Sequence, residues 1–192
     1  MKLKLALSVM AVVAIMAVGS ANAVPYTMDF TNATLDIGAA SQIDLTNQYN
    51  AFGLNFSHIY RYIDSRDPFD QYGISNGNAG ENSNPAATGT ITFTSSTSFV
   101  DFDWWSIGTN NVVISAFDAA HNVLGTFVGT GSGSNSIRAT GIKYLTLHDD
   151  GGFAQISNLT YDRNPVPEPA TMTLLGLGLL GAGVIRRRRG NK

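Results

Sequence analysis

The 192-residue sequence predicts an all-β protein, an antiparallel β-sandwich placed between two short apolar segments at the ends of the chain. Strand-like runs, in which apolar and polar residues alternate, recur at intervals of roughly 8–12 residues through the central part. Clusters of Gly, Asn and Asp separate these runs, and no central segment shows the 3.6-residue periodicity of a helix. Short strands at this spacing are typical of a sandwich, so we expect a jelly roll first and an immunoglobulin-like topology second.

The first 23 residues have the pattern of a signal peptide. Residues 1–4 are basic, residues 5–18 are apolar, and Ala21-Asn22-Ala23 forms a small-x-small cleavage site. The alternative is a transmembrane anchor, but the apolar stretch is short for that purpose. We therefore expect cleavage after Ala23 and a single exported domain over residues 24–164, about 140 residues and enough for one core.

The expected strands of this domain are short runs rich in Val, Ile, Phe, Tyr and Thr. In chain order they cover residues 26–30, 52–57, 89–94, 98–104, 111–117, 122–128, 142–148 and 153–161. Two segments interrupt the pattern. Residues 61–85 are long, polar and irregular, which predicts a loop of functional interest. Residues 129–135 are mostly Gly and Ser, which predicts a flexible connector.

The charge of the domain excludes one class of partner. Residues 24–164 carry five Lys and Arg residues against thirteen Asp and Glu residues, a net charge of −8. Nucleic acid is bound by clustered basic residues, so we expect no nucleic-acid partner. The chain has no cysteine, so no disulfide framework supports the fold.

The C-terminal 28 residues, 165–192, form a separate unit. Pro167-Glu168-Pro169 makes a stiff spacer, residues 171–185 carry no charge, and Arg186, Arg187, Arg188 and Arg189 open the basic tail of residues 186–192. As a helix the apolar run would be roughly 22 Å long, short of the ~30 Å hydrocarbon core but enough for a span with local thinning. The arginines should stay in the cytoplasm, so that the domain before them faces outward.

These residues together resemble the PEP-CTERM sorting signal of Gram-negative bacteria that make exopolysaccharide. The resemblance rests on Pro167, Glu168 and Pro169, the apolar segment and the arginine cluster, in this order at the end of the chain. It implies an exosortase-type membrane protease as a partner, a transient anchor in the inner membrane, and release to the cell surface or extracellular matrix. It further implies a role in exopolysaccharide or biofilm assembly.

The later strands resemble domains that are found attached to such tails. The segments concerned are 113–118, 122–125, 141–147 and 156–161, with a departure at Asn158, where related sequences often carry Asp. This resemblance implies a lectin-like or galactose-binding-like jelly roll. In such domains a structural calcium often joins the first and last strands, and the matching acids here are Asp29 and Asp162.

The chemistry-bearing residues favour binding over catalysis. Alternation in the strand at 98–104 buries Val100, Phe102 and Trp104 and turns Asp101 and Asp103 to the solvent, with Trp105 on their side unless a bulge returns it to the core. An exposed indole beside carboxylates can stack on a sugar ring, while the carboxylates accept hydrogen bonds from the hydroxyl groups of the sugar.

The alternative is a polysaccharide-active hydrolase, because Asp101 and Asp103 lie about 6.6–7 Å apart at the rise of a strand. The sequence shows no nucleophile elbow and no metal-binding histidine pair. No cofactor is expected apart from a structural calcium, for which Asp149 and Asp150 are further candidate ligands. We therefore expect an exported, non-enzymatic glycan-binding or structural matrix protein.

Overall fold

A computed structural model describes residues 24–31, 42–65, 67–69, 72–77, 87–106, 111–150 and 154–163. All of them belong to one compact unit, Val24–Arg163. The expected signal peptide, the Pro167-Glu168-Pro169 spacer, the apolar segment 171–185 and Arg186–Arg189 lie outside the described residues. Within the described residues, no helix combines the length and the apolar character that a membrane crossing requires.

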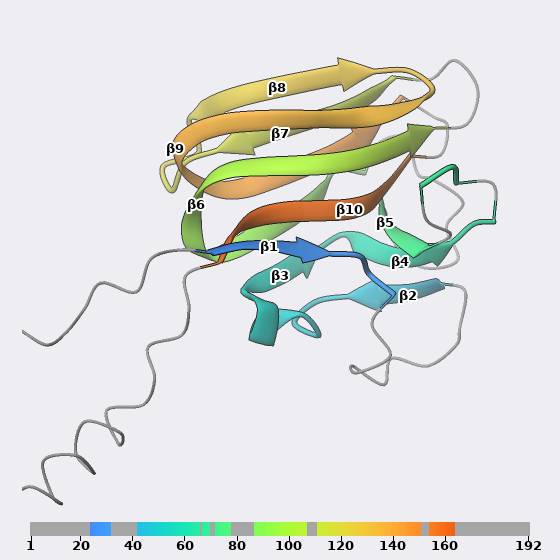
Figure 1. Cartoon of the computed structure of the whole chain (residues 1–192), viewed down its shortest axis with the longest axis horizontal. Coiled ribbons are helices and arrows are strands. Elements are labelled where there is room, and N and C mark those ends of the chain that lie inside the picture. Colours follow the sequence, from blue (N-terminus) through green and yellow to red (C-terminus); the bar gives the residue numbers. More distant parts are fainter. Residues whose placement is uncertain are drawn as a thin grey trace, which may run out of the picture. The chain divides into compact units, whose positions relative to one another are not determined.

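The described chain is almost entirely strand (Figure 1). The strands are β1 (Val24–Met28), β2 (Gln42–Leu45), β3 (Leu54–Ser57), β4 (Ile59–Ile63), β5 (Tyr72–Asn76), β6 (Gly89–Ser106), β7 (Val112–Phe117), β8 (Val123–Gly129), β9 (Ser132–Asp149) and β10 (Ala154–Arg163). One short 3₁₀ helix, η2 (Asn50–Phe52), precedes β3.

All strand pairs are antiparallel and belong to one continuous sheet in the order β2-β4-β5-β10-β6-β9-β7-β8, with β1 beside β10 and β3 beside β6. The two 18-residue strands β6 and β9 pair with each other and curl round, so that each runs through both layers of a sandwich (Figure 1). The first layer holds β1, β10, the second half of β6 and the first half of β9. The second layer holds β3, the first half of β6, the second half of β9, β7 and β8.

The bends have local causes in both long strands. In β6 the register shifts on either side of Thr97, which is 2% exposed and donates its hydroxyl to the carbonyl of Phe99 at 2.8 Å. This bulge inverts the alternation, since Ile91 and Phe93 are buried before it and Val100 and Phe102 after it. In β9 the bend falls at Gly141, whose φ of +87° is readily adopted only by glycine.

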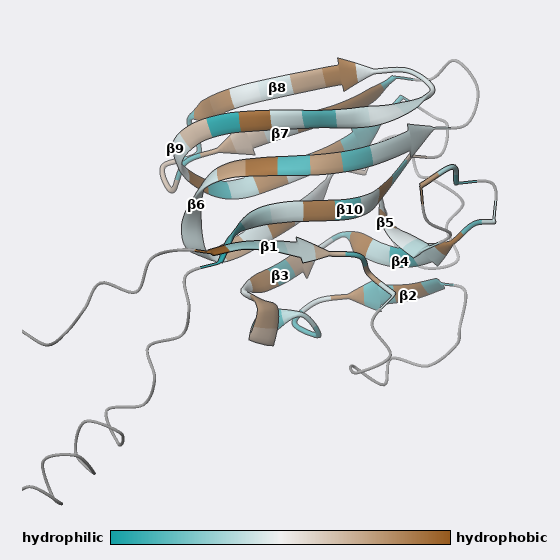
Figure 2. Ribbon diagram, viewed as in Figure 1, coloured by the Kyte–Doolittle hydropathy of each residue, from teal (hydrophilic) through white to brown (hydrophobic). Residues whose placement is uncertain are grey.

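The core lies between the two layers. Val100, Phe102 and Trp104 of the first layer and Ile114, Leu145 and Leu147 of the second belong to one cluster of buried side chains. Figure 2 shows the resulting bands of hydrophobic and hydrophilic residues along β6 and β9. The first and last strands, β1 and β10, pair over five residues, so the two ends of the domain lie side by side. The structure thus confirms the predicted all-β, antiparallel class, and the single continuous sheet differs from the two separate sheets of an immunoglobulin domain.

Two expectations about irregular segments are wrong. The Gly/Ser-rich residues 129–135 are not a flexible connector, because β8 runs to Gly129 and β9 begins at Ser132 after a tight turn with Gly131 at φ +86°. Nor are residues 61–85 a continuous loop, since they include the end of β4 and all of β5, which pairs with β4 and with β10.

Candidate functional site

The outward face of the first layer is a polar surface built on three neighbouring strands. Asp103 of β6 lies opposite Ser134 of β9 on one side and opposite Asn158 of β10 on the other. Two residues earlier on β6, Asp101 lies opposite Ser136 and Thr160. Because successive side chains of a strand point to opposite faces, these residues share the solvent side while Val100, Phe102 and Trp104 fill the core.

Asp103 is held by its two cross-strand neighbours. The hydroxyl of Ser134 donates to Oδ1 of Asp103 at 2.5 Å, and Nδ2 of Asn158 donates to Oδ2 at 2.8 Å. Each carboxylate oxygen has a further lone pair, so Asp103 still has room to accept hydrogen bonds from a ligand. The three side chains therefore present a fixed row of acceptors and donors.

Asp101 is held from one side by Arg138 of β9. Nη2 of Arg138 lies 3.2 Å from Oδ1 and 3.4 Å from Oδ2 of Asp101. The guanidinium carbon of Arg138 lies 5.1 Å from the centre of the Phe99 ring, which limits the directions that the arginine can take. Both charged side chains remain accessible, with 67% of the Arg138 side chain and 39% of the Asp101 side chain exposed.

A shallow depression lies on this surface. Its volume is about 90 Å³, and it is lined by Asp101, Phe102, Asp103, Ser134, Asn135, Asn158 and Thr160. The lining combines carboxylates, amides and hydroxyls, which both donate and accept hydrogen bonds. Such a lining matches the hydroxyl groups of a carbohydrate better than an apolar ligand.

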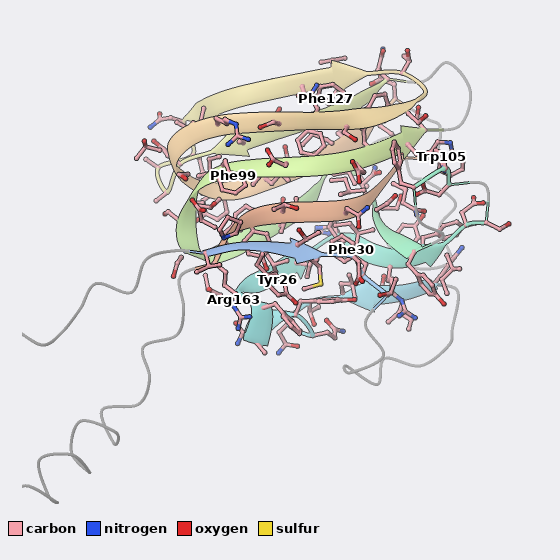
Figure 3. All side chains as sticks on the ribbon, in the orientation of Figure 1. Tyr26, Phe30, Phe99, Trp105, Phe127 and Arg163 are labelled. Atoms are coloured by element: carbon pink, nitrogen blue, oxygen red, sulfur yellow. The ribbon has the colours of Figure 1, made fainter. Side chains whose placement is uncertain are left out.

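Trp105 follows Asp101 and Asp103 on the same side of β6, and its side chain is half-buried. Figure 3 shows it at one end of β6, with Phe99 toward the other. It lies opposite Gln155, whose Nε2 donates to Oδ2 of Asp67 at 2.8 Å, and the hydroxyl of Ser157 donates to the same oxygen. Asp67 therefore anchors the segment after β4 beside Trp105 and borders the polar surface at that end.

The two acids that resemblance assigned to calcium do not come together. Asp162 lies opposite Pro25, and its Oδ2 accepts hydrogen bonds from the amide and hydroxyl of Ser98. Asp29 follows Met28 at the other end of the β1–β10 ladder and accepts the amide of Thr31 at 3.1 Å. Four residues of strand separate the two positions along the ladder, about 13 Å at the rise of a strand.

Asp149 and Asp150 also point in different directions. Asp149 is the last residue of β9 and is fully buried, whereas Asp150 is exposed. The carboxylate of Asp150 accepts a hydrogen bond from Nδ2 of Asn111 at 3.0 Å and lies 3.8 Å from Nε2 of His148. Among the described residues, no group of three or more His, Cys, Asp or Glu side chains is arranged to hold a metal ion.

The partners of the acids are the site residues that the sequence does not predict. Ser134, Asn135, Asn158, Thr160 and Arg138 all lie in strands next to β6, and their contribution depends on register. One signal was present: Ser132, Ser134 and Ser136 alternate with Gly133 and Asn135 at the period of a strand. The Gly/Ser composition concealed it.

Comparison with known proteins identifies the tail. Residues 165–189 match the family model described as the PEP-CTERM protein-sorting motif, and a motif of this kind implies an exported protein that is processed at the membrane. The Pro-Glu-Pro spacer, the apolar segment and all four arginines lie within the match. The comparison with curated proteins gave no match.

Solved structures with a related arrangement include three carbohydrate-binding modules. A family 29 module is 14% identical with a TM-score of 0.41, and the match covers 76% of this chain and 99% of that one. TmCBM61, solved with β-1,4-galactotriose, is 10% identical with a TM-score of 0.38 and coverages of 57% and 88%. CBM36, solved with calcium and xylotriose, is 16% identical with a TM-score of 0.36 and coverages of 64% and 100%. At scores this low, the ligands of these modules carry no argument about this chain.

Proposed function

We propose that this protein is an exported, non-catalytic polysaccharide-binding protein that uses the polar face of β6, β9 and β10. The observation that carries the proposal is the row Ser134–Asp103–Asn158, hydrogen-bonded across three strands beside a depression of about 90 Å³. A sheet fixes these groups in place, so little conformational entropy is lost when a ligand binds. Trp105, two residues from Asp103 on the same side of β6, supplies a ring on which a sugar can stack.

The charge of the surface restricts the ligand. Asp101 and Asp103 accept hydrogen bonds from sugar hydroxyls or from amino groups, whereas they repel the carboxylates of an acidic polysaccharide. Arg138 neutralises Asp101 in part and adds a donor at the edge of the site. The site therefore favours neutral or amino-substituted polysaccharides.

The environment of the two acids favours binding over hydrolysis. A glycosidase needs one carboxyl group in an apolar setting, where it stays protonated and acts as the acid. Asp101 has Arg138 and open solvent around it, and Asp103 has a serine and an asparagine. The hydrolase alternative predicts new reducing ends on incubation with polysaccharide, and we expect none.

The sorting motif sets where this binding takes place. In the proposed route a signal peptide over residues 1–23 leads to export, and residues 171–185 hold the chain in the inner membrane with Arg186–Arg189 in the cytoplasm. An exosortase-type protease then cuts near Pro167-Glu168-Pro169, and the domain reaches the cell surface or the extracellular matrix. The intact mass of the exported protein tests this route, because a form that retains residues 171–192 would contradict it.

Co-sedimentation with the extracellular polysaccharide of the producing organism tests the binding. The full chain is solubilised in mild detergent and compared with Trp105→Ala and Asp103→Ala, with and without calcium. We expect the full chain to be retained and each variant to bind about tenfold more weakly, a loss of ~1.4 kcal/mol. The matched control is Asp150→Ala, an exposed acid outside the site, which should bind as the unchanged chain does. Equal retention of all four proteins would contradict the proposed site.

A further inference from the structure

The outward face of the second layer carries a row of hydroxyl groups that crosses five strands. Ser57 of β3 lies opposite Thr90 of β6, which lies opposite Thr146 of β9. Thr146 in turn lies opposite Ser115 of β7, and Ser115 lies opposite Thr126 of β8. Every strand of the layer therefore contributes one hydroxyl to the same row.

The sheet itself sets the spacing of this row. Neighbouring strands lie about 4.8 Å apart, so five strands place the hydroxyls over roughly 19 Å. The hydroxyls of Ser115 and Thr126 lie 3.0 Å apart, and Thr146 Oγ1 donates to the carbonyl of Ser115 at 3.4 Å. Ser57 and Thr126 at the ends are exposed, Thr90 and Thr146 are half-buried, and Ser115 in the row is 9% exposed.

A second row, parallel to the first, adds aromatic rings. It runs from Asn55 through Thr92 and Tyr144 to Phe117, again one residue per strand. Tyr144 and Phe117 are half-buried, and the imidazole of His121 stacks on the Tyr144 ring with centroids 4.5 Å apart and planes at 7°. The strip therefore places aromatic rings directly beside the hydroxyls, with the imidazole of His121 covering one face of Tyr144.

The turn between β7 and β8 holds His121 over this strip. His121 has a φ of +63°, an uncommon conformation for a residue other than glycine. The carboxylate of Asp118 fixes the turn, because it accepts the amide of Ala120 at 2.8 Å, the amide of Asn122 at 2.9 Å and Nδ2 of Asn122 at 2.9 Å. The ring pair is thus built into the fold and does not depend on a ligand.

The two rows carry no Asp, Glu, Lys or Arg, in contrast to the acidic face of the first layer. We propose that this hydroxyl face binds an extended, uncharged β-linked polysaccharide chain that runs across the strands. A β-1,4-linked chain advances per sugar by nearly the width of one strand, so successive sugars meet successive hydroxyls. The ring of Phe117 and the exposed imidazole of His121, which is stacked on Tyr144, contact the apolar faces of the sugars. This surface is separate from the polar face of β6, β9 and β10, because it lies on the other layer of the sandwich.

Binding to amorphous cellulose, an uncharged β-1,4-linked glucan, tests the inference. The full chain in mild detergent is sedimented with the glucan beside the double variant Thr90→Val, Thr146→Val, which removes two hydroxyls and keeps the β-branched shape. We expect the double variant to bind at least tenfold more weakly. The matched control is Thr140→Val, an exposed threonine of β9 outside both rows, which should bind as the unchanged chain does. Thermal unfolding of each variant shows that the fold is retained.

A second variant separates this surface from the acidic face. Asp103→Ala should lose less cellulose binding than the double variant does, even where it loses the polysaccharide of the producing organism. The inference is overturned if the unchanged chain does not bind cellulose, if the double variant binds like the control, or if Asp103→Ala weakens binding as much as the double variant does. Failure of the proposed function at Trp105 and Asp103 would leave the cellulose result unchanged.

Discussion

Two tyrosines in the core, Tyr49 and Tyr161, differ in what their hydroxyl groups contact. The hydroxyl of Tyr161 donates to the carbonyl of Phe52 at 2.6 Å. The hydroxyl of Tyr49, a residue with 0% exposure, has no hydrogen-bond partner within the part of the chain that the structure describes. Burial raises the pKa of both phenols, and that of Tyr49 reaches about 12. Both rings are buried among other aromatic rings, so the main difference between the two hydroxyls is the hydrogen bond.

We predict opposite effects when each hydroxyl is removed. Tyr161→Phe should lower the free energy of unfolding by about 0.5–1.5 kcal/mol, the usual net value of one hydrogen bond. Tyr49→Phe should leave it unchanged or raise it, because a buried hydroxyl without a partner costs free energy. Denaturant unfolding of the full chain at neutral pH measures both changes. Equal losses would show that Tyr49 has a partner in solution.

The raised pKa of Tyr49 also predicts a dependence on pH. In the unfolded chain this phenol ionises near its ordinary value of 10, whereas in the folded chain it stays neutral up to about 12. Its contribution is therefore complete below pH 10 and is lost as the pH rises toward 12. The advantage of Tyr49→Phe over the unchanged chain should grow across this interval, as unfolding curves at pH 9, 10 and 11 would show. A constant difference would contradict the assignment.

At the scale of single elements, the hairpin of β8 and β9 depends on which glycines face Trp104. A Cβ on Gly129 would lie 2.6 Å from Cζ2 of Trp104 and 2.5 Å from Cζ of Phe127. A Cβ on Gly133 would lie 3.4 Å or more from the same indole, an ordinary contact. Gly129 is therefore required by the close approach of the buried Trp104, whereas Gly133 has room for a methyl group.

The two glycines form a matched pair for substitution. Gly129→Ala should lower the free energy of unfolding by about 1–3 kcal/mol, because the added methyl group displaces the rings beneath it. Gly133→Ala should be neutral or stabilising by up to about 1 kcal/mol, since it removes the conformational freedom of a glycine within a strand. Thermal unfolding of the two variants measures the contrast, and the reverse order would contradict the packing around Trp104.

The sequence predicts a strand well where one face of that strand is strongly apolar. It predicts a strand poorly where the packing of that strand depends on distant parts of the chain. The alternation of Val100, Phe102 and Trp104 with Asp101 and Asp103 was sufficient to orient the second half of β6. The sequence does not predict the first half of β9, because Gly133 faces Trp104 and the serines face the solvent, so no apolar residues alternate there. β4 and β5 were hidden for a related reason: buried polar residues such as Arg61 and Ser75 obscure the pattern.

The candidate site depended on register, which the sequence does not encode locally. The sequence predicts Asp101 and Asp103 on the solvent side of β6, and the structure places them there; their role in binding stays a prediction. Their partners come from β9 and β10, more than 30 and 50 residues away along the chain. The bulge between Ile156 and Asn158, which sets Asn158 opposite Asp103, has no signature in the sequence.

At the scale of the whole domain, the two faces of the sandwich differ in chemistry. The first layer presents carboxylates, amides and a half-buried indole, and the second presents hydroxyls with Tyr144 and Phe117 beside them. The two proposals together imply a domain that links two polysaccharide chains, and the sorting motif implies that the protein is exported. The acidic net charge of residues 24–164 favours solubility.

Hydroxyl-radical footprinting of the full chain, with and without the extracellular polysaccharide of the producing organism, tests the central claim most directly. The chain has two tryptophans, and they are neighbours: Trp104 is 5% exposed, whereas Trp105 is half-buried on the polar face. Saturating polysaccharide should reduce the oxidation of Trp105 several-fold, while Trp104 stays little oxidised in both samples. Oxidation of Trp105 that is the same with and without bound polysaccharide would contradict the proposed site.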